Sequence, residues 1–587
     1  MRVEYEIYPI PKSINYLNKT FDIGRLVIEN TNADEDVLRK ADELSRTYSI
    51  NNELENKVNI EVDTSLSDKY DYYELFIDDS ISIKAISNDA AFYALVTLEH
   101  ILKQASGKVR ALSIKDYASM KLRGVIEGYY GIPWGNDKRK DLIEFGARFK
   151  NNVFIFAPKD DPYHRDKWRE LYPQEELVAI GKLAKIGNQL KNRYVWTITP
   201  FKKECDPIGP ENFEEATDIL IEKFEQLYAV GVRQFGVLGD DVGGLPRQTV
   251  VDVMHKVSEW GKDKGDVYDF VFVPEAYVMA EWGFKGDELD KYSKEFPMDV
   301  QIMFTGENVC SPVTQETVDD FKNKRIEQGV RRDPLFWLNW PVNDIDRNEF
   351  RRLFMGKASM LEPGIKNLVG VVTNPLEEAY ASLPAIFQIA DYTWNSECFN
   401  AQKSWEASFK YIDEDAHEEL FEIAKHMSSA DEGGIEGLEE SVELGEMLKE
   451  FNHRMVVNGN YDFLYHAQIL KEEFKKISDS VENYFIKSKN EAMKKEIKVY
   501  FDNLKYKTLA AVLFIEIIEE DKKKSLDLEK AKSKFEKALE LLEKADDCKV
   551  FTTTSEFPNK ELRAESGTKV INKEINKMKE YAKHCIG

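Results

Sequence analysis

The chain has 587 residues, which is too long for one compact core at roughly 150 residues per domain. Its 81 Lys and Arg residues against 106 Asp and Glu give a net charge of −25, which argues against nucleic acid as the main partner because phosphate binding needs excess positive charge. Hydrophobic residues make up 42% of the sequence, so most of the chain is expected to form packed cores.

The cysteines and the N-terminus bear on the cell compartment and on metal sites. The five cysteines lie far apart without a CxxC pair, so they predict neither a disulfide framework nor a zinc site. The start, MRVEYEIYPIPK, lacks the basic and apolar regions of a signal peptide, and no apolar run reaches the roughly 18 residues of a membrane helix. We expect no membrane contact, with a cytoplasmic location if the chain is complete and a secreted one if a leader was removed.

Residues 1–117 are predicted to form a small α+β domain. Four short apolar stretches at 25–30, 57–62, 72–77 and 81–86 are typical of strands. The segment 89–104 that follows has apolar residues at helical spacing.

Residues 118–402 alternate strand and helix patterns. Eight runs rich in β-branched or aromatic residues are predicted as strands, at 121–127, 152–158, 193–200, 232–239, 269–275, 300–306, 335–340 and 368–375. Amphipathic segments lie between most of them, such as 138–150, 175–191, 213–231 and 249–262. Eight alternating units over this length indicate a (β/α)₈ barrel, the TIM-barrel fold, of the α/β class.

Residues 403–587 lose the strand pattern and become rich in Lys and Glu with helical spacing, which predicts a C-terminal helical bundle. Residues 428–437 are predicted to form a glycine-rich loop within it. Residues 411–450 hold 14 acidic and 2 basic residues, so nearly half of the negative charge is local. The simplest interpretation is a solvated bundle, and the alternative is a surface for a partner or for dimerisation.

Catalytic groups of such barrels gather at the carboxyl ends of the strands. Six of the eight predicted strands end in polar or aromatic residues of the kind that hold a sugar. These residues are Glu127, Gly128, Tyr129, Tyr130, Lys159, Asp160, Asp161, Asp240, Asp241, Tyr277, Trp337, Asn339, Asp344 and Asn374. Any one of them alone could be a loop or capping residue, but their joint occurrence indicates a site.

Asp240 and Asp241 are the most informative pair, because two adjacent carboxylates after an apolar strand repel each other and lose solvation. On extended backbone they would point to opposite sides, so different roles are expected. Ordinary glycosidases hold two carboxylates about 5 Å or more apart. An adjacent pair suits substrate-assisted chemistry, in which the acetamido group of the sugar is the nucleophile. A helix N-cap or a divalent-metal site are the alternatives for this pair.

Several motifs together resemble glycoside hydrolase family 84, the β-N-acetylglucosaminidases that include the O-GlcNAcases. They are RGVIEGYYGIPW, NVFIFAPKDDPYHRDKWRELYP, the Asp pair, WLNWPVNDID and GVVTNP. The resemblance covers the whole predicted barrel, and the order of the flanking domains is similar to that of bacterial members.

This resemblance implies a role for each matching residue. Asp240 would polarise the acetamido N–H, and Asp241 would be the general acid and base. The residues implied to bind the sugar are Gly128, through its carbonyl, Lys159, through a hydroxyl, Asp344 and Asn374, on the O4 and O6 side, Asn339, near the acetamide, and Tyr277 and Trp337, around the acetyl methyl.

Two positions depart from the family pattern. Gly239 precedes the acidic pair where members often carry a larger residue, so the pocket floor is expected to differ. Tyr277 stands in VPEAY rather than after Thr and Glu, which weakens its assignment. His164 is expected to be structural, and Asp160 and Asp161 are expected to order their loop through backbone hydrogen bonds.

The sequence therefore predicts a retaining exo-β-N-acetylglucosaminidase that acts through an oxazoline intermediate, with no metal and no cofactor. Its partner would be a glycan or glycoprotein carrying terminal β-linked N-acetylglucosamine, and the oligomeric state is not predicted. The alternatives are a hexosaminidase for hyaluronan, which the negative charge disfavours, and a non-catalytic sugar-binding barrel.

Overall fold

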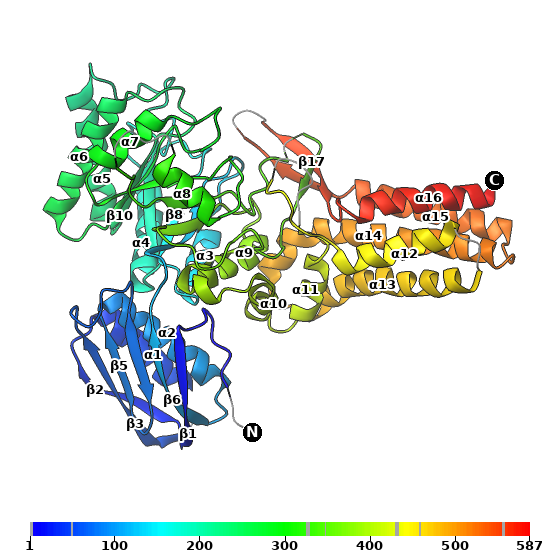
Figure 1. Ribbon diagram of the computed structural model, residues 1–587, viewed down its shortest axis with the longest axis horizontal. Coiled ribbons are helices and arrows are strands. Elements are labelled where there is room, and N and C mark those ends of the chain that lie inside the picture. The colour runs from blue at the N-terminus through cyan, green and yellow to red at the C-terminus, as the bar shows by residue number, and fades with distance from the viewer. Residues whose placement is uncertain are drawn as a thin grey trace.

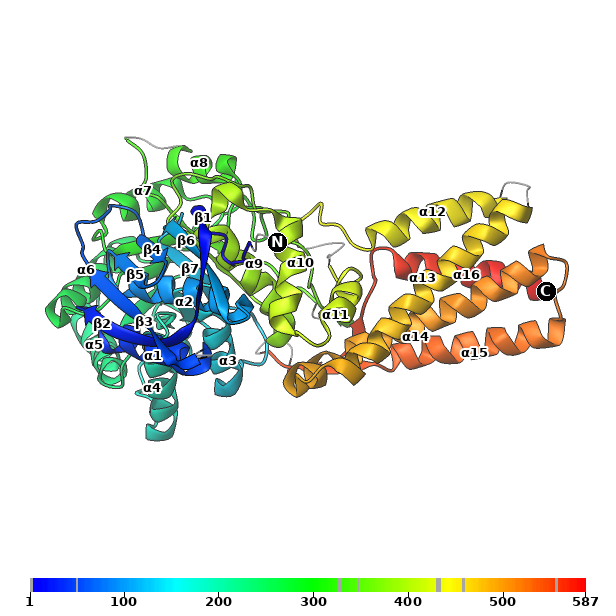
Figure 2. The same ribbon diagram turned by 90° about the horizontal axis from the view of Figure 1, so that it is seen from below.

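The computed structural model describes residues 4–48, 51–324, 329–346, 348–428, 434–456, 460–554 and 558–587 (Figure 1). A six-stranded N-terminal sheet lies below a closed barrel, and a long bundle of C-terminal helices projects from one side of the barrel (Figures 1 and 2). None of the helices in these residues is both long and apolar enough to cross a membrane.

The N-terminal sheet has the strand order β1-β6-β4-β5-β3-β2, with α1 and α2 packed against it. Its elements are β1 (Ser13–Asp22), β2 (Gly24–Thr31), α1 (Glu35–Tyr48), β3 (Asn51–Val62), β4 (Tyr73–Ile77), β5 (Ile81–Ala85), α2 (Asn88–Gln104) and β6 (Lys108–Asp116). The four predicted strands and the predicted helix are confirmed. β1, α1 and β6 were not predicted from the sequence. For β1 the reason is that most of its side chains are exposed, so its sequence lacks the apolar pattern of a buried strand.

The predicted (β/α)₈ barrel is confirmed, since eight parallel strands close in the order β10-β11-β12-β13-β15-β7-β8-β9. The strands are β7 (Leu122–Glu127), β8 (Val153–Phe156), β9 (Arg193–Ile198), β10 (Gln234–Leu238), β11 (Phe270–Val273), β12 (Val300–Phe304), β13 (Leu335–Leu338) and β15 (Gly370–Thr373). The surrounding helices are α3 (Asn136–Ala147), α4 (Gln174–Gln189), α5 (Phe213–Ala229), α6 (Arg247–Lys264), α7 (Gly286–Glu295), α8 (Gln315–Asn323) and α9 (Leu383–Trp394), the last preceded by the short turn η1 (Tyr380–Ser382).

The barrel strands are buried on both faces, which explains their continuous apolar sequences. A separate core fills the lumen, with Ile126, Ile155, Leu238 and Met303 among its members. Trp337 closes this core at the carboxyl end of the strands, where it is 5% exposed. The lumen is thus solid below the level at which a ligand could enter.

The N-terminal sheet covers the opposite end of the barrel. Lys150, which precedes β8, bonds to Asp116 at the end of β6 at 3.2 Å and to the hydroxyl of Tyr73 at 3.0 Å. Trp394 of α9 lies over the same ammonium at 4.1 Å. Burial lowers the pKa of Lys150 to about 8. This buried ion pair fixes the N-terminal sheet to the barrel, so the carboxyl ends of the strands form the face turned away from that sheet.

The C-terminal region is helical as predicted, but it also contains strands that the sequence analysis did not expect after residue 403. Its helices are α10 (Ala401–Ile412), which follows the turn η2 (Ser396–Cys398), and α11 (His417–Ala424), α12 (Val442–Val456), α13 (Asn460–Lys487), α14 (Glu491–Lys522), α15 (Leu528–Asp546) and α16 (Ile571–Ile586). Residues 429–433 of the predicted glycine-rich loop lie outside the described residues.

The unexpected strands are β16 (Lys549–Thr552) and β17 (Lys560–Glu565), which pair with each other. β17 also pairs in parallel with β14 (Phe350–Arg352), in the long segment between barrel strands β13 and β15. A strand from the end of the chain is therefore bonded to a loop on the open face of the barrel.

Glu127, at the end of β7, is a fully buried carboxylate outside the barrel lumen. Arg139 of α3 donates to both of its oxygens, at 2.7 and 2.9 Å, and the backbone N–H of Trp134 adds a third bond at 2.9 Å. Burial raises the pKa of Glu127, and the Arg139 charge opposes that shift. Glu127 thus ties the first strand to the first helix and does not face a ligand.

The substitution Arg139→Met should leave this carboxylate buried without a cation and cost about 3–5 kcal/mol of stability, seen as a lower unfolding temperature. The loss should shrink as the pH falls, because a protonated Glu127 has no charge to compensate. Lys140→Met, which removes an exposed pair with Glu144, is the control and should change little. Equal losses for the two variants would contradict the assignment.

Candidate functional site

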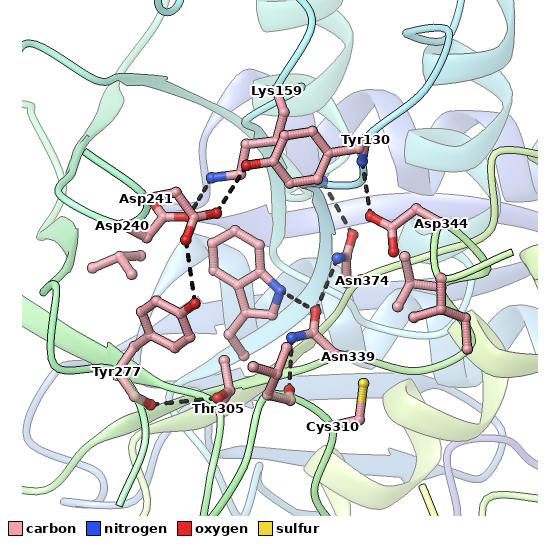
Figure 3. A pocket seen from close by; sticks show the side chains of 16 residues that line it. Tyr130, Lys159, Asp240, Asp241, Tyr277, Thr305, Cys310, Asn339, Asp344 and Asn374 are labelled. Carbon is pink, nitrogen blue, oxygen red and sulfur yellow. Dashed lines mark hydrogen bonds and ion pairs between the residues drawn. The ribbon is translucent and has the colours of Figure 1, made fainter. Parts of the chain in front are cut away.

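A cavity of about 210 Å³ opens at the carboxyl end of the barrel strands (Figure 3). All nine residues to which the family resemblance gave a role line it, although they come from six different strand ends. These residues are Gly128, Lys159, Asp240, Asp241, Tyr277, Trp337, Asn339, Asp344 and Asn374. The other lining residues are Tyr130, Val273, Thr305, Val309, Cys310, Val342 and Ile345.

Asp240 follows β10 and is buried at the cavity wall. Lys159, from the loop after β8, forms an ion pair with its Oδ2. Both side chains are at most 8% exposed, so this is a buried pair in which each charge needs the other. The second oxygen, Oδ1, is buried and has no hydrogen-bond partner among the described residues. That atom is an acceptor left for an N–H or O–H group of a ligand.

Asp241 is more exposed and differs from its neighbour in backbone and in partners. Its φ of +56° places it in the left-handed region, so the chain turns at Asp241 and the predicted extended geometry of the pair was wrong. Its Oδ2 accepts a hydrogen bond from the Tyr130 hydroxyl at 2.8 Å, and its Oδ1 accepts one from Tyr277 at 3.3 Å. The turn brings both carboxylates to one cavity.

The two tyrosines that bond to Asp241 remain hydrogen-bond donors over a wide pH range. Burial, and then the negative charge of Asp241, raises the pKa of Tyr130 and of Tyr277. Tyr277 also fixes the neighbouring loop, since its carbonyl accepts a bond from the Thr305 N–H at 2.9 Å. The structure thus places Tyr277 at the site despite its unusual sequence context.

The alternatives for the acidic pair do not fit this geometry. Helix α6 begins at Arg247 with Pro246 in the capping position, so neither aspartate is its N-cap. Within the described ranges, no three His, Cys, Asp or Glu side chains group as a metal site would require.

A chain of amide and indole bonds forms one wall of the cavity (Figure 3). Asn339 Oδ1 accepts from the Trp337 indole N–H and from the Asn374 amide, both at 2.9 Å. Asn374 Oδ1 in turn accepts from the Gly128 N–H at 3.2 Å, and the Asn339 amide donates to the Val309 carbonyl at 2.8 Å. Each polar group of this wall is fixed before a ligand arrives.

Asp344 lies across the cavity from the acidic pair in the view of Figure 3. Its Oδ2 accepts the backbone N–H of Tyr130 at 2.9 Å. Cys310 lines the wall on the same side, where burial and then the charge of Asp344 raise the pKa of its thiol to about 12. The thiol therefore stays protonated and is a poor nucleophile at neutral pH.

Tyr130 was among the predicted strand-end residues but received no role, and Thr305 was not predicted at all. Tyr130 stands beside Gly128 in the EGYYG motif, but only the structure shows that its hydroxyl, rather than that of buried Tyr129, meets Asp241. Thr305 directly follows β12, so the rule of strand ends would have found it had that end been included.

Gly239 was expected to change the floor of the cavity, but it does not lie at the cavity. A Cβ at this position would meet the Leu245 side chain at 2.7 Å and the Val273 carbonyl at 3.0 Å, and Gly239 is not a lining residue. The position faces the packing of the following loop.

The loop after β8 has the structural groups that were predicted. His164 is buried, its Nδ1 lies 2.7 Å from the Thr197 carbonyl, and burial lowers its pKa to about 3. Asp160 accepts the Gly131 N–H at 3.1 Å, and Asp161 accepts the His164 N–H at 2.9 Å. The loop-ordering role of these residues is confirmed.

The fold and the site define a glycoside hydrolase barrel, in which adjacent carboxylates and fixed amides face one cavity of about 210 Å³. A family model described as beta-N-acetylglucosaminidase matches residues 123–425, and one described as glycosyl hydrolase family 20, domain 2, matches residues 4–117. The chain belongs to this β-N-acetylglucosaminidase family, glycoside hydrolase family 84.

Individual relatives agree with this assignment. The solved structure of CpGH84D is 36% identical, with a TM-score of 0.89 over 99% of this chain and 100% of that one. The structure of CpGH84B is 26% identical, with a TM-score of 0.83 over 98% and 100%. The protein O-GlcNAcase of Rattus norvegicus is 27% identical over 295 residues, which are 48% of this chain and only 30% of the rat protein.

Gly128 is required by the Trp337 ring, since an added Cβ would lie 2.4 Å from its Cζ2 atom. Gly128→Ala should therefore displace the indole, disturb its bond to Asn339, and cost about 1–3 kcal/mol through overpacking. Gly445→Ala, inside α12, is the control, because nothing lies within 4 Å of an added Cβ there and Ala suits a helix interior. A crystal structure of the variant with the indole unmoved, or equal unfolding temperatures for both, would refute this.

Proposed function

We propose that the protein is a retaining exo-β-N-acetylglucosaminidase that uses the acetamido group of its substrate as the nucleophile. The observation that carries this proposal is the unpartnered, buried Oδ1 of Asp240 beside a carboxylate at the cavity mouth. The ion pair with Lys159 fixes Asp240 through its other oxygen. A fixed acceptor that lacks a donor is suited to an amide N–H.

In the first step, Asp240 accepts the acetamido N–H and so increases the electron density on the acetamido carbonyl oxygen. That oxygen attacks C1 of the sugar and forms a new C–O bond while the bond from C1 to the leaving oxygen breaks. Asp241 gives its proton to the leaving oxygen, and an oxazoline remains that is still protonated on nitrogen, with this N–H hydrogen-bonded to the Asp240 carboxylate. Asp241 suits this role because it is the more exposed of the two carboxylates and can reach the leaving group.

In the second step, Asp241 takes a proton from water while the water oxygen attacks C1. The C–O bond of the oxazoline breaks, the acetamido group is restored, and Asp241 is protonated again. Two inversions at C1 give net retention of configuration. These steps need no cofactor.

The remaining residues of the cavity would hold the sugar. We assign the acetyl methyl to Tyr277 and Trp337, and the acetamide region also to Asn339. The O4 and O6 side would be held by Asp344 and Asn374, and other hydroxyls by Lys159 and the Gly128 carbonyl.

The cavity also supports exo action. Its volume of about 210 Å³ is below the roughly 300–1,000 Å³ of clefts for drug-sized ligands, so it suits one terminal ring. The substrate would be terminal β-linked N-acetylglucosamine on a glycan or on Ser or Thr of a protein.

Asp240→Asn and Asp241→Ala should each abolish nearly all hydrolysis of an aryl N-acetyl-β-glucosaminide while the protein stays folded. Asp241→Ala should retain relatively more activity on substrates with good leaving groups, because their departure needs less protonation. Asp240→Asn should lose activity on both kinds. Asp263→Asn, at the exposed face of α6, is the matched control with the same charge change. Full activity in both site variants would refute the proposal, and binding of a thiazoline analogue without any turnover by the wild type would favour a binding protein.

A comparison of substrates would identify the natural leaving group. Turnover of a glycopeptide or an N-glycan should exceed that of hyaluronan fragments at low salt, since a net charge of −25 repels a polyanion. Added salt should narrow the difference. A preference for hyaluronan that persists at low salt would instead favour the glycosaminoglycan alternative.

A further inference from the structure

Arg165 is a buried cation that contacts Asp241 and takes no part in the proposed proton transfers. It lies in the loop between β8 and α4 and is 7% exposed. The cavity does not include it among its lining residues, so it does not touch a ligand there.

The Arg165 guanidinium contacts Asp241 in two ways. Its Nη2 donates to the main-chain carbonyl of Asp241 at 3.2 Å. Its Nη1 donates to the Tyr130 hydroxyl at 3.5 Å, and that hydroxyl donates to the Asp241 carboxylate at 2.8 Å. One planar fork thus reaches both the backbone and the side chain of the same residue.

The loop of Asp241 fixes its backbone better than its carboxylate. A non-glycine residue at φ +56° is held against a cost of about 1–2 kcal/mol. Gly243 and Gly244 follow it, both with positive φ and with nothing within 4 Å of an added Cβ. Val242, between these glycines and Asp241, is 3% exposed and belongs to the core, so the backbone beside Asp241 is anchored while its exposed carboxylate is held by the hydroxyls of Tyr130 and Tyr277.

The loop that carries Arg165 is, in contrast, firmly fixed. The preceding residue, His164, is buried against the Thr197 carbonyl, and the Arg165 N–H donates to the Pro162 carbonyl at 3.3 Å. Lys223 of α5 donates to the Tyr163 carbonyl at 2.7 Å. Arg165 can thus transmit a fixed position to Asp241.

We propose that Arg165 is a positioning residue that holds the carboxylate of Asp241 in line with the leaving oxygen, through the Asp241 carbonyl and the Tyr130 hydroxyl. This inference rests on the proposed role of Asp241 as acid and base. Loss of Arg165 leaves the sugar contacts intact but lets the carboxylate move, so protonation of the leaving group suffers most.

The charges around Asp241 give a second readout. Arg165, Asp240, Tyr130 and Tyr277 lie around it, and Lys159 is paired with Asp240. Removal of the Arg165 cation takes a positive charge away from the groups that transfer the proton, and a nearby cation favours the deprotonated form of an acid. The basic limb of the profile of kcat/KM against pH should therefore move to higher pH, which a loss of packing alone would not cause.

The test compares Arg165→Met, Arg165→Lys and the control Arg169→Met on aryl glucosaminides with good and poor leaving groups. Arg169 lies in the same loop, over the Trp168 ring and paired with Asp206 and Glu215. Arg165→Met should lose about 10- to 100-fold in kcat on poor leaving groups, far less on good ones, and shift the basic limb upward. Arg165→Lys keeps the positive charge but loses the planar guanidinium. Its basic limb in the profile of kcat/KM against pH should therefore stay at the wild-type pH, while its activity on poor leaving groups should still fall.

The inference fails if Arg165→Met matches Arg169→Met in both readouts, or if Arg165→Lys restores wild-type turnover of poor leaving groups. If the Arg165 variants do not fold, Tyr130→Phe decides, since it cuts the hydroxyl bond and leaves the cation in place. The same dependence on the leaving group supports the inference, and its absence overturns it. A wild-type protein without hydrolysis would instead contradict the proposed function itself.

Discussion

The ion pair between Lys159 and Asp240 is the interaction around which the site is built. It joins the loops after β8 and β10 across the end of β9, and both partners are buried. A carboxylate at this depth is stable as an anion only beside a cation, and Lys159 bonds to one oxygen alone. The other oxygen is therefore fixed and open to a hydrogen-bond donor of a ligand.

The same constraint on buried charge orders the rest of the open face of the barrel. Arg352 binds both oxygens of Asp346, and Arg351 binds Glu377 at 2.8 Å. Asn343, the neighbour of Asp344, donates to Glu378 at 2.7 Å, and Glu378 accepts the hydroxyl of Tyr500 from α14. The C-terminal helices thus hold the residue next to a lining aspartate, so they are part of the support of the cavity.

Much of the fold could be predicted because the eight barrel strands are buried on both faces and therefore have long apolar runs. The rule that active sites lie at the carboxyl ends of barrel strands then predicted nine residues that the structure places at one cavity. The rule fails where successive side chains of a strand point to opposite sides. At the end of β7, Glu127 faces α3 while Gly128 faces the cavity. The sequence did not reveal the left-handed turn at Asp241 or the strands β16 and β17, because β17 has a charged sequence and its partner β14 lies far away in the chain.

The pairing of β14 with β17 has a consequence for how the protein is made. Phe350 to Arg352, in the segment that follows Asp344, pair with Arg563 to Glu565 near the C-terminus. During synthesis the barrel strands leave the ribosome long before β17 does, so the barrel can close while this segment still lacks its partner. The segment after Asp344 is then the last part of the barrel face to gain its partner strand, and a chain released early would hold a closed barrel with β14 unpaired.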